Sequence, residues 1–125
     1  MSQIKEHKIL IIEDEKSIAD ALMLKLQKEG FKVDIAFGGE EALTILQPGK
    51  YSLIFCDLIM PTVDGFMILK TLRDKKINTP VVVLTNLSDV EYEKKAKDLG
   101  AAGLYVKTDT PLAHIVKIAK SFIKE

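Results

Sequence analysis

The sequence lacks tryptophan and has a single cysteine, Cys56, among its 125 residues. One cysteine excludes an internal disulfide framework, and with it the small secreted domains that such frameworks stabilise. No apolar run approaches the roughly 20 residues that cross a bilayer. The polar first residues also lack the apolar centre of a signal peptide. These absences favour a cytoplasmic protein without membrane contact.

An excess of charge of either sign is also missing, because 18 Lys and Arg balance 18 Asp and Glu. A neutral chain gives no bulk argument for direct binding to nucleic acid or to an anionic membrane. Apolar residues make up 47% and charged residues 29%, which is an ordinary globular balance. We expect residues 1–125 to form one domain around one core, with no second domain in this chain.

Short apolar runs alternate with longer amphipathic stretches along the chain. The apolar runs predict five strands, at residues 8–12, 31–35, 53–56, 81–84 and 104–106. The amphipathic stretches predict five helices, at residues 17–29, 39–47, 64–73, 88–99 and 110–123. Such alternation predicts an α/β fold, with a parallel sheet covered by helices on both faces.

The apolar patterns of the strands predict their order in the sheet. The run at residues 31–35 alternates apolar and polar residues, as expected at an edge, whereas the runs at 8–12, 53–56 and 81–84 are continuous, as expected in the centre. The order 2-1-3-4-5 satisfies both conditions and is that of a flavodoxin-like (βα)5 three-layer sandwich. Ligands of such sheets bind at the carboxyl ends of the strands, beside the first and third.

Three helix starts have recognisable capping residues. Asp64 is a suitable N-cap for the third helix. Ser88 and Glu91 have the spacing of a capping box for the fourth. Thr110 and Pro111 form a cap and first-turn pair for the fifth.

Reactive side chains follow four of the predicted strands, namely Glu13 and Asp14, Asp57, Thr85, and Lys107. Each one alone has an ordinary explanation as a turn, cap or surface residue. Together they place three carboxylates at one sheet edge, where mutual repulsion raises their pKa values. Mg²⁺ would relieve this repulsion, because it prefers oxygen ligands. With a hydroxyl and an ammonium group nearby, the set suits phosphoryl transfer to an aspartate nucleophile.

The segment at residues 57–65 reads Asp-Leu-Ile-Met-Pro-Thr-Val-Asp-Gly. It resembles the Asp-x-x-Met-Pro-x-x-Asp-Gly segment of the response-regulator receiver domains of two-component signalling. The acidic pair Glu13–Asp14, Thr85 and Lys107 match the same family at the expected strand ends. The resemblance extends over residues 7–124.

The resemblance implies that Asp57 accepts a phosphoryl group from a phosphohistidine of a sensor histidine kinase or a histidine phosphotransfer protein. It implies that Asp14 and Asp57 ligate Mg²⁺ directly, that Glu13 acts mostly through a bound water, and that the backbone carbonyl of Ile59 completes the protein ligands. Lys107 would contact the phosphoryl group, or Asp57 before modification.

The resemblance also implies a switch and an output surface. Thr85 would move towards the phosphoryl group and Tyr105 would change rotamer with it, although Tyr105 could equally be an ordinary half-buried edge tyrosine. The fourth helix, last strand and last helix would then bind a downstream effector or a second copy of the chain. The fourth helix has a thin apolar face, formed by Val90, Ala96 and Leu99, while the orientation of Tyr92 is ambiguous. A helix with so little apolar surface favours a switching role.

Two positions depart from the family pattern. Thr108 replaces the proline that usually follows the lysine, so we expect either a trans peptide in a rearranged loop or a cis peptide that costs about 2.5–4 kcal/mol. Asn86 replaces a small residue after the switch threonine, where it could narrow access to the phosphoryl group or donate a hydrogen bond. We expect Ile59 and Leu87 to exclude the attacking water and to prolong the phosphorylated state.

Two other functions compete with a signalling phosphoacceptor, which would catalyse only its own phosphorylation and slow dephosphorylation. A small Mg²⁺-dependent phosphatase with an aspartyl-phosphate intermediate usually needs a second aspartate shortly after the nucleophile. Leu58 and Ile59 follow Asp57 instead. A flavodoxin-like cofactor binder needs a glycine-rich phosphate loop after the first strand, where this chain has acidic residues.

Overall fold

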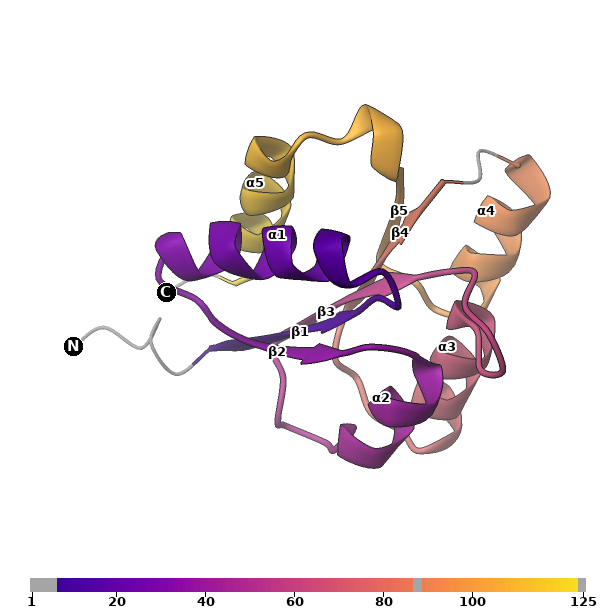
Figure 1. Ribbon diagram of the computed structural model, residues 1–125. Helices are drawn as coiled ribbons and strands as arrows, with labels where there is room; N and C mark the ends of the chain where they lie inside the picture. The colour runs from indigo at the N-terminus through magenta and orange to yellow at the C-terminus, as the bar shows by residue number, and fades with distance from the viewer. Residues whose placement is uncertain (1–6, 87–88, 124–125) are drawn as a thin grey trace.

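The computed structural model describes residues 7–86 and 89–123, whose elements alternate between strand and helix as the apolar pattern predicts (Figure 1). The strands are β1 (Lys8–Ile12), β2 (Lys32–Ala36), β3 (Leu53–Asp57), β4 (Val81–Thr85) and β5 (Gly103–Val106). The helices are α1 (Lys16–Lys28), α2 (Gly39–Ile45), α3 (Gly65–Asp74), α4 (Val90–Asp98) and α5 (Leu112–Phe122), with a short 3₁₀ helix, η2 (Lys107–Asp109), before α5.

The strands form one parallel sheet in the order β2-β1-β3-β4-β5, which confirms the predicted order. All residues of β3 and β4 are buried, whereas β2 is buried fully only at Ala36. This difference explains the sequence pattern, since central strands contact helices on both faces and an edge strand does not. The register pairs Ile12 with Cys56 and Thr85 with Val106, so the carboxyl ends lie along one edge.

Helices cover both faces of the sheet, with α1 and α5 on one side and α2, α3 and α4 on the other (Figure 1). Each side has its own hydrophobic core. Leu26 of α1 and Ala119 of α5 pack with Phe55 on the first side. Ile68 of α3 and Ala96 of α4 pack with Ile54 on the second. In the described residues, no helix is long and apolar enough to cross a membrane.

The helix starts agree only in part with the predicted caps. Asp64 caps α3 as predicted, because its Oδ1 accepts the amide proton of Met67 at 2.9 Å. The N-cap of α4 is Asp89, which accepts from Glu91 N, while Ser88 lies outside the described residues. The prediction for Thr110 is wrong: Pro111 is the N-cap of α5, and the Thr110 hydroxyl donates to the carbonyl of Val106 at 2.8 Å.

Helix α4 is attached to the domain by few side chains. Ala96 is its one buried residue between Val90 and Asp98. The prediction that Val90 belongs to the apolar face is wrong, because that side chain is 76% exposed. Val90 is the first residue of α4 and faces solvent, which its spacing did not reveal.

The peptide between Lys107 and Thr108 is trans, since the described residues contain no cis peptide. The chain forms the 3₁₀ turn η2 at this point instead. Of the two alternatives expected for Thr108, the structure therefore has the rearranged loop.

Candidate functional site

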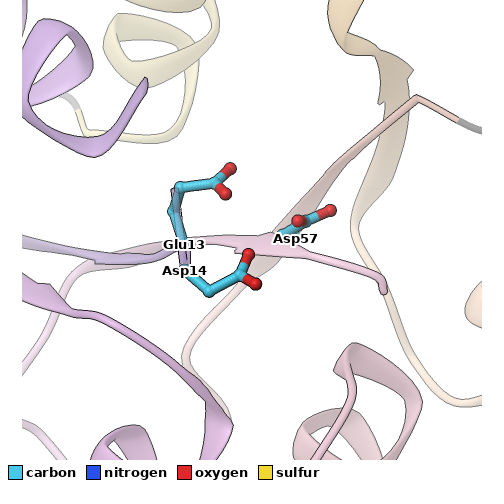
Figure 2. A group of neighbouring side chains, drawn as sticks. All are labelled: Glu13, Asp14 and Asp57. Atoms are coloured by element: carbon cyan, nitrogen blue, oxygen red, sulfur yellow. The ribbon is translucent and has the colours of Figure 1, made fainter. Parts of the chain in front are cut away.

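Three carboxylates meet where β1 and β3 end (Figure 2). Glu13 and Asp14 directly follow β1, and Asp57 is the last residue of β3. Because Ile12 lies beside Cys56 in the sheet, the residues that come next are neighbours as well. One carboxylate oxygen from each of the three lies within 4.8 Å of the others. This spacing and this all-oxygen donor set fit a hard divalent cation such as Mg²⁺.

The three carboxylates differ in their exposure to solvent. Glu13 and Asp57 are 2% and 8% exposed, whereas Asp14 is open to solvent. Burying a charged group is unfavourable unless other groups compensate it. The site therefore requires a cation, from the protein or from solution.

Lys107, which directly follows the edge strand β5, supplies that positive charge. Its Nζ lies 2.5 Å from Oε1 of Glu13 and 3.3 Å from Oδ2 of Asp57. The lysine side chain is only 12% exposed. The other oxygen of Glu13, Oε2, accepts the backbone amide proton of Glu15 at 3.0 Å. Both oxygens of Glu13 are thus bound within the protein.

Burial controls the protonation of the two buried carboxyl groups. It raises the pKa of Asp57, and the nearby charge of Asp14 adds to the rise, although Lys107 opposes both. Burial likewise raises the pKa of Glu13 despite the hydrogen bond from Lys107. Burial alone would lower the pKa of Lys107, but the hydrogen bond to Glu13 and the charge of Asp57 outweigh it, and the pKa is raised. Lys107 alone therefore does not offset the unfavourable burial of the negative charge on Glu13 and Asp57.

A cavity of about 470 Å³ opens over Asp57. Side chains from four strand ends and one helix line it, namely Asp14, Glu15, Asp57, Ile59, Thr85, Asn86, Tyr92 and Lys107. Thr85 is the last residue of β4 and is 1% exposed, whereas Asn86 is exposed at the mouth. Ile59 is 50% exposed, so its side chain borders the opening. We call this cavity the acceptor cleft.

The acceptor cleft brings together most of the residues that the sequence singled out. Glu13 does not line it but contacts Lys107, which does. Tyr105 does not line it either: it is half-buried, packs against the core beneath α1 and α5, and meets the ring of His114 edge-on at 5.6 Å. Tyr92 was missed, because its position in a charged helix left its orientation ambiguous. Leu87, expected beside Ile59, lies outside the described residues.

A close backbone contact holds the loop after Asp57 in place. The amide of Gly65 donates to the carbonyl of Leu58 at 2.8 Å. A Cβ atom at position 65 would lie 2.6 Å from the carbonyl oxygen of Asp57 and 2.8 Å from Cα of Leu58. Only glycine leaves room for α3 to begin this close to the strand end. The Asp64–Gly65 pair of the sequence motif therefore has a local structural cause.

Two other reactive side chains lie apart from the cleft. His7 is at the opposite end of β1, where Nδ1 lies 3.0 Å from the Ser52 hydroxyl. Cys56 is buried in β3, and desolvation together with the charge of Asp57 raises the pKa of its thiol. Neither was assigned a role from the sequence, and neither lines the cleft.

Comparisons with known proteins agree with this geometry. The family model of the response regulator receiver domain matches residues 9–119. The transcriptional regulatory protein CusR of Escherichia coli is 37% identical over 100 residues, which are 80% of this chain and 44% of CusR. DltR of Streptococcus agalactiae, also a transcriptional regulatory protein, is 37% identical over 94 residues, or 75% of this chain and 42% of DltR. The chain spans less than half the length of these relatives.

Solved structures show the same fold over nearly the whole chain. The receiver domain of the Francisella response regulator 1452 has a TM-score of 0.86 and 30% identity, covering 93% of this chain and 95% of that one. Chemotaxis protein CheY4 of Vibrio cholerae has a TM-score of 0.85 and 29% identity, with coverages of 94% and 98%. TrrA of Thermotoga maritima, solved in complex with Mg(2+)-BeF, has a TM-score of 0.82 and 29% identity, with coverages of 94% and 99%. The chain belongs to the response regulator receiver domain family.

Proposed function

We propose that the chain is the phosphoacceptor of a two-component or phosphorelay system and that Asp57 is the residue phosphorylated. The observation that supports this most directly is the position of Asp57, 3.3 Å from Lys107 and beside Glu13 and Asp14 at the floor of the acceptor cleft. A carboxylate so placed can act as a nucleophile while neighbouring positive charge stabilises the transferring group.

The phosphoryl donor is a phosphohistidine of a sensor histidine kinase or a phosphotransfer protein. A carboxylate oxygen of Asp57 attacks phosphorus, the phosphorus–nitrogen bond breaks, and the histidine nitrogen keeps the electron pair. Lys107 is already near Asp57 and neutralises charge on the arriving oxygens. Thr85, at the end of the adjacent strand, lines the cleft, and its hydroxyl would bind one of those oxygens.

Mg²⁺ is the cofactor that the donor set fits. Asp14 and Asp57 would ligate it, Glu13 would act mostly through a water, and the backbone carbonyl of Ile59 would add a protein ligand. When bound, the ion supplies positive charge that neutralises the transferring phosphoryl group. The Mg(2+)-BeF complex of TrrA, which shares the fold, supports this assignment.

An apolar cavity of about 490 Å³ adjoins the acceptor cleft and offers a contact surface for the donor protein. It lies between α1 and α5, and apolar side chains including Ile18, Leu22 and Ile115 line it. Lys107 and Asn86 line both cavities, so a protein seated here reaches the mouth of the cleft.

Phosphorylation changes the surface formed by α4, β5 and α5, which binds a downstream effector protein or a second copy of the chain in the cytoplasm. Thr85 and Asn86 lead from the cleft towards α4, and Lys107 directly follows β5. Tyr105 lies in β5 and would change its rotamer with Thr85. The sparse anchorage of α4 suits an element with two arrangements.

A phosphatase is less well supported by the site. Leu58 is fully buried and Ile59 is apolar, so neither residue after Asp57 can protonate a leaving group. The chain would instead catalyse only its own phosphoryl transfer and slow dephosphorylation.

Mass spectrometry of the intact protein tests the proposal. After incubation with Mg²⁺ and a small acyl phosphate, we expect the wild-type chain to gain one phosphoryl group and Asp57→Asn to gain none. Asp74→Asn, on the exposed end of α3, serves as the matched control and should gain one. Rapid multiple turnover of small phosphomonoesters without a stable mass gain would instead support the phosphatase.

A further inference from the structure

Two residues of α4 contact the ring of Phe66, in the first turn of α3. The Tyr92 ring lies 5.8 Å from it, centroid to centroid, at a tilt of 43°. The ammonium group of Lys95 lies 4.4 Å from its centroid. Phe66 itself is 8% exposed. Ring pairs and cations over rings at these distances attract, so Phe66 is a platform on which the first turns of α4 rest.

These contacts carry much of the attachment of α4. Apart from Phe66, the helix is held mainly by Ala96, its one buried side chain. Val90 and the charged residues around it face solvent. Phe66 belongs to the hydrophobic core on this side of the sheet, and its ring holds Tyr92 against that core.

Tyr92 also lines the acceptor cleft together with Asp57 and Ile59. It is 37% exposed, which places it at the mouth and not at the floor. No other residue of α4 lines this cleft. One side chain thus contacts both the Phe66 platform and the space above the acceptor.

The platform is rigidly placed relative to the acceptor. Phe66 directly follows Gly65, whose missing Cβ allows it to pack against the carbonyl oxygen of Asp57. The Gly65 amide also donates to Leu58, the residue after Asp57. Gly65 packs against Asp57, and the next residue, Phe66, contacts Tyr92. These contacts hold Tyr92 at a fixed distance from Asp57.

We propose that Tyr92 is a gating residue of the acceptor cleft, held in place by Phe66, which limits how readily water and small phosphodonors reach Asp57. This inference rests on the proposed phosphorylation of Asp57. In the reaction that Tyr92 restrains, a water oxygen attacks phosphorus and the bond from phosphorus to the Asp57 oxygen breaks. The carboxylate and inorganic phosphate are released, and the water proton passes to solvent.

Tyr92→Ala tests the proposed gating role, because it removes the aromatic ring from the mouth of the cleft and leaves the metal and acceptor residues unchanged. We expect the half-life of the phosphorylated chain to fall by roughly fivefold, and the rate of phosphorylation by a small acyl phosphate to rise. Tyr92→Phe keeps the ring and should remain within about twofold of wild type, because the ring and not the hydroxyl narrows the cleft. Phe66→Leu removes the platform and should act in the same direction as Tyr92→Ala, with a smaller effect.

Val90→Ala is the matched control, since Val90 lies on the same helix, is exposed and does not line the cleft. Its rates should equal those of wild type. Unchanged rates in Tyr92→Ala, or equal changes in Tyr92→Ala and Tyr92→Phe, would overturn the gate while leaving the proposed function intact. A wild-type chain that gains no phosphoryl group would overturn both.

Discussion

Lys107 and Glu13 form the shortest ion pair of the acceptor site, with 2.5 Å between Nζ and Oε1, although the two residues are 94 positions apart in the sequence. Asp57 is the second partner of the lysine, at 3.3 Å. The resemblance to the family implied the contact with Asp57. The contact with Glu13 became visible only when the strand ends came together.

Replacing this lysine should therefore destabilise the fold. In Lys107→Met, two buried carboxylates lose their cation, and we expect the free energy of unfolding to fall by roughly 2–3 kcal/mol in metal-free buffer. Urea denaturation measures the change. Lys120→Met is the control, because its pair with Glu29 is exposed and should contribute much less to stability. Equal losses in the two variants would contradict the role assigned to Lys107.

Asp57→Asn should stabilise the metal-free protein near neutral pH, by on the order of 1 kcal/mol. Burial raises the pKa of Asp57 in the folded state above its ordinary value of 3.8. The folded state thus prefers the protonated form, and stability from this group is present below that value and lost as pH rises through the raised pKa. The advantage of the variant should be small below about pH 4 and grow towards neutral pH.

Glu29→Gln provides a control of opposite sign for that titration. The hydrogen bond and charge of Lys120 lower the pKa of Glu29. Its small contribution is therefore present near neutral pH and lost as pH falls, so the variant should be slightly less stable at pH 7 and match wild type in acid. An advantage of Asp57→Asn that does not change with pH would contradict the assigned cause.

Mg²⁺ should raise the melting temperature of the wild-type chain, since a ligand that binds only the folded state stabilises it. The gain is about 2.7 kcal/mol at 100 times the dissociation constant. Asp14→Asn should weaken this response although Asp14 is exposed, because it removes an oxygen from the cluster. Asp74→Asn, whose side chain pairs with Lys70 on α3, should respond as wild type does. Calorimetric melting with and without Mg²⁺ decides between these outcomes.

Gly65→Ala should destabilise the protein by roughly 2–3 kcal/mol, because the new Cβ meets backbone atoms that cannot move independently. Gly49→Ala is the comparison: it has a φ of +77° but no atom within 4 Å, so only the backbone conformation is strained. We expect that variant to lose about 1 kcal/mol. Chemical denaturation of both proteins would show the difference, and a smaller loss at position 65 would contradict the packing account.

The phosphorylated chain should last minutes or longer, because the apolar side chain of Ile59 borders the cleft and hinders the attacking water. Ile59→Asn should shorten the half-life by roughly threefold, since an amide can hold water at the opening. Decay of the phosphorylated mass over time measures both values. A wild-type half-life of seconds would contradict the expected protection.

Local pattern was enough to predict most of the fold. Continuous apolar runs marked the central strands and alternation marked β2 as the edge, because burial on one or both faces acts directly on side-chain choice. Asp64 was recognised as a cap because its bond to Met67 is local. Thr110 was wrongly predicted to cap α5, because its hydroxyl donates to the carbonyl of Val106 instead. A threonine can form several alternative hydrogen bonds with nearby backbone groups, and the sequence does not show which of them forms.

By itself, the sequence determined the order of the strands and therefore which reactive residues share one edge of the sheet. Asp57, Glu13 and Lys107 could be brought together on that basis, since parallel strands place their carboxyl ends side by side. Only the tertiary structure decided which of them touch, how deeply each is buried, and that Tyr92 of α4 lines the cleft. The physical reason is that the order of the strands follows from the pattern of apolar residues along the chain. The distances between side chains and their desolvation depend on groups that are remote in the sequence.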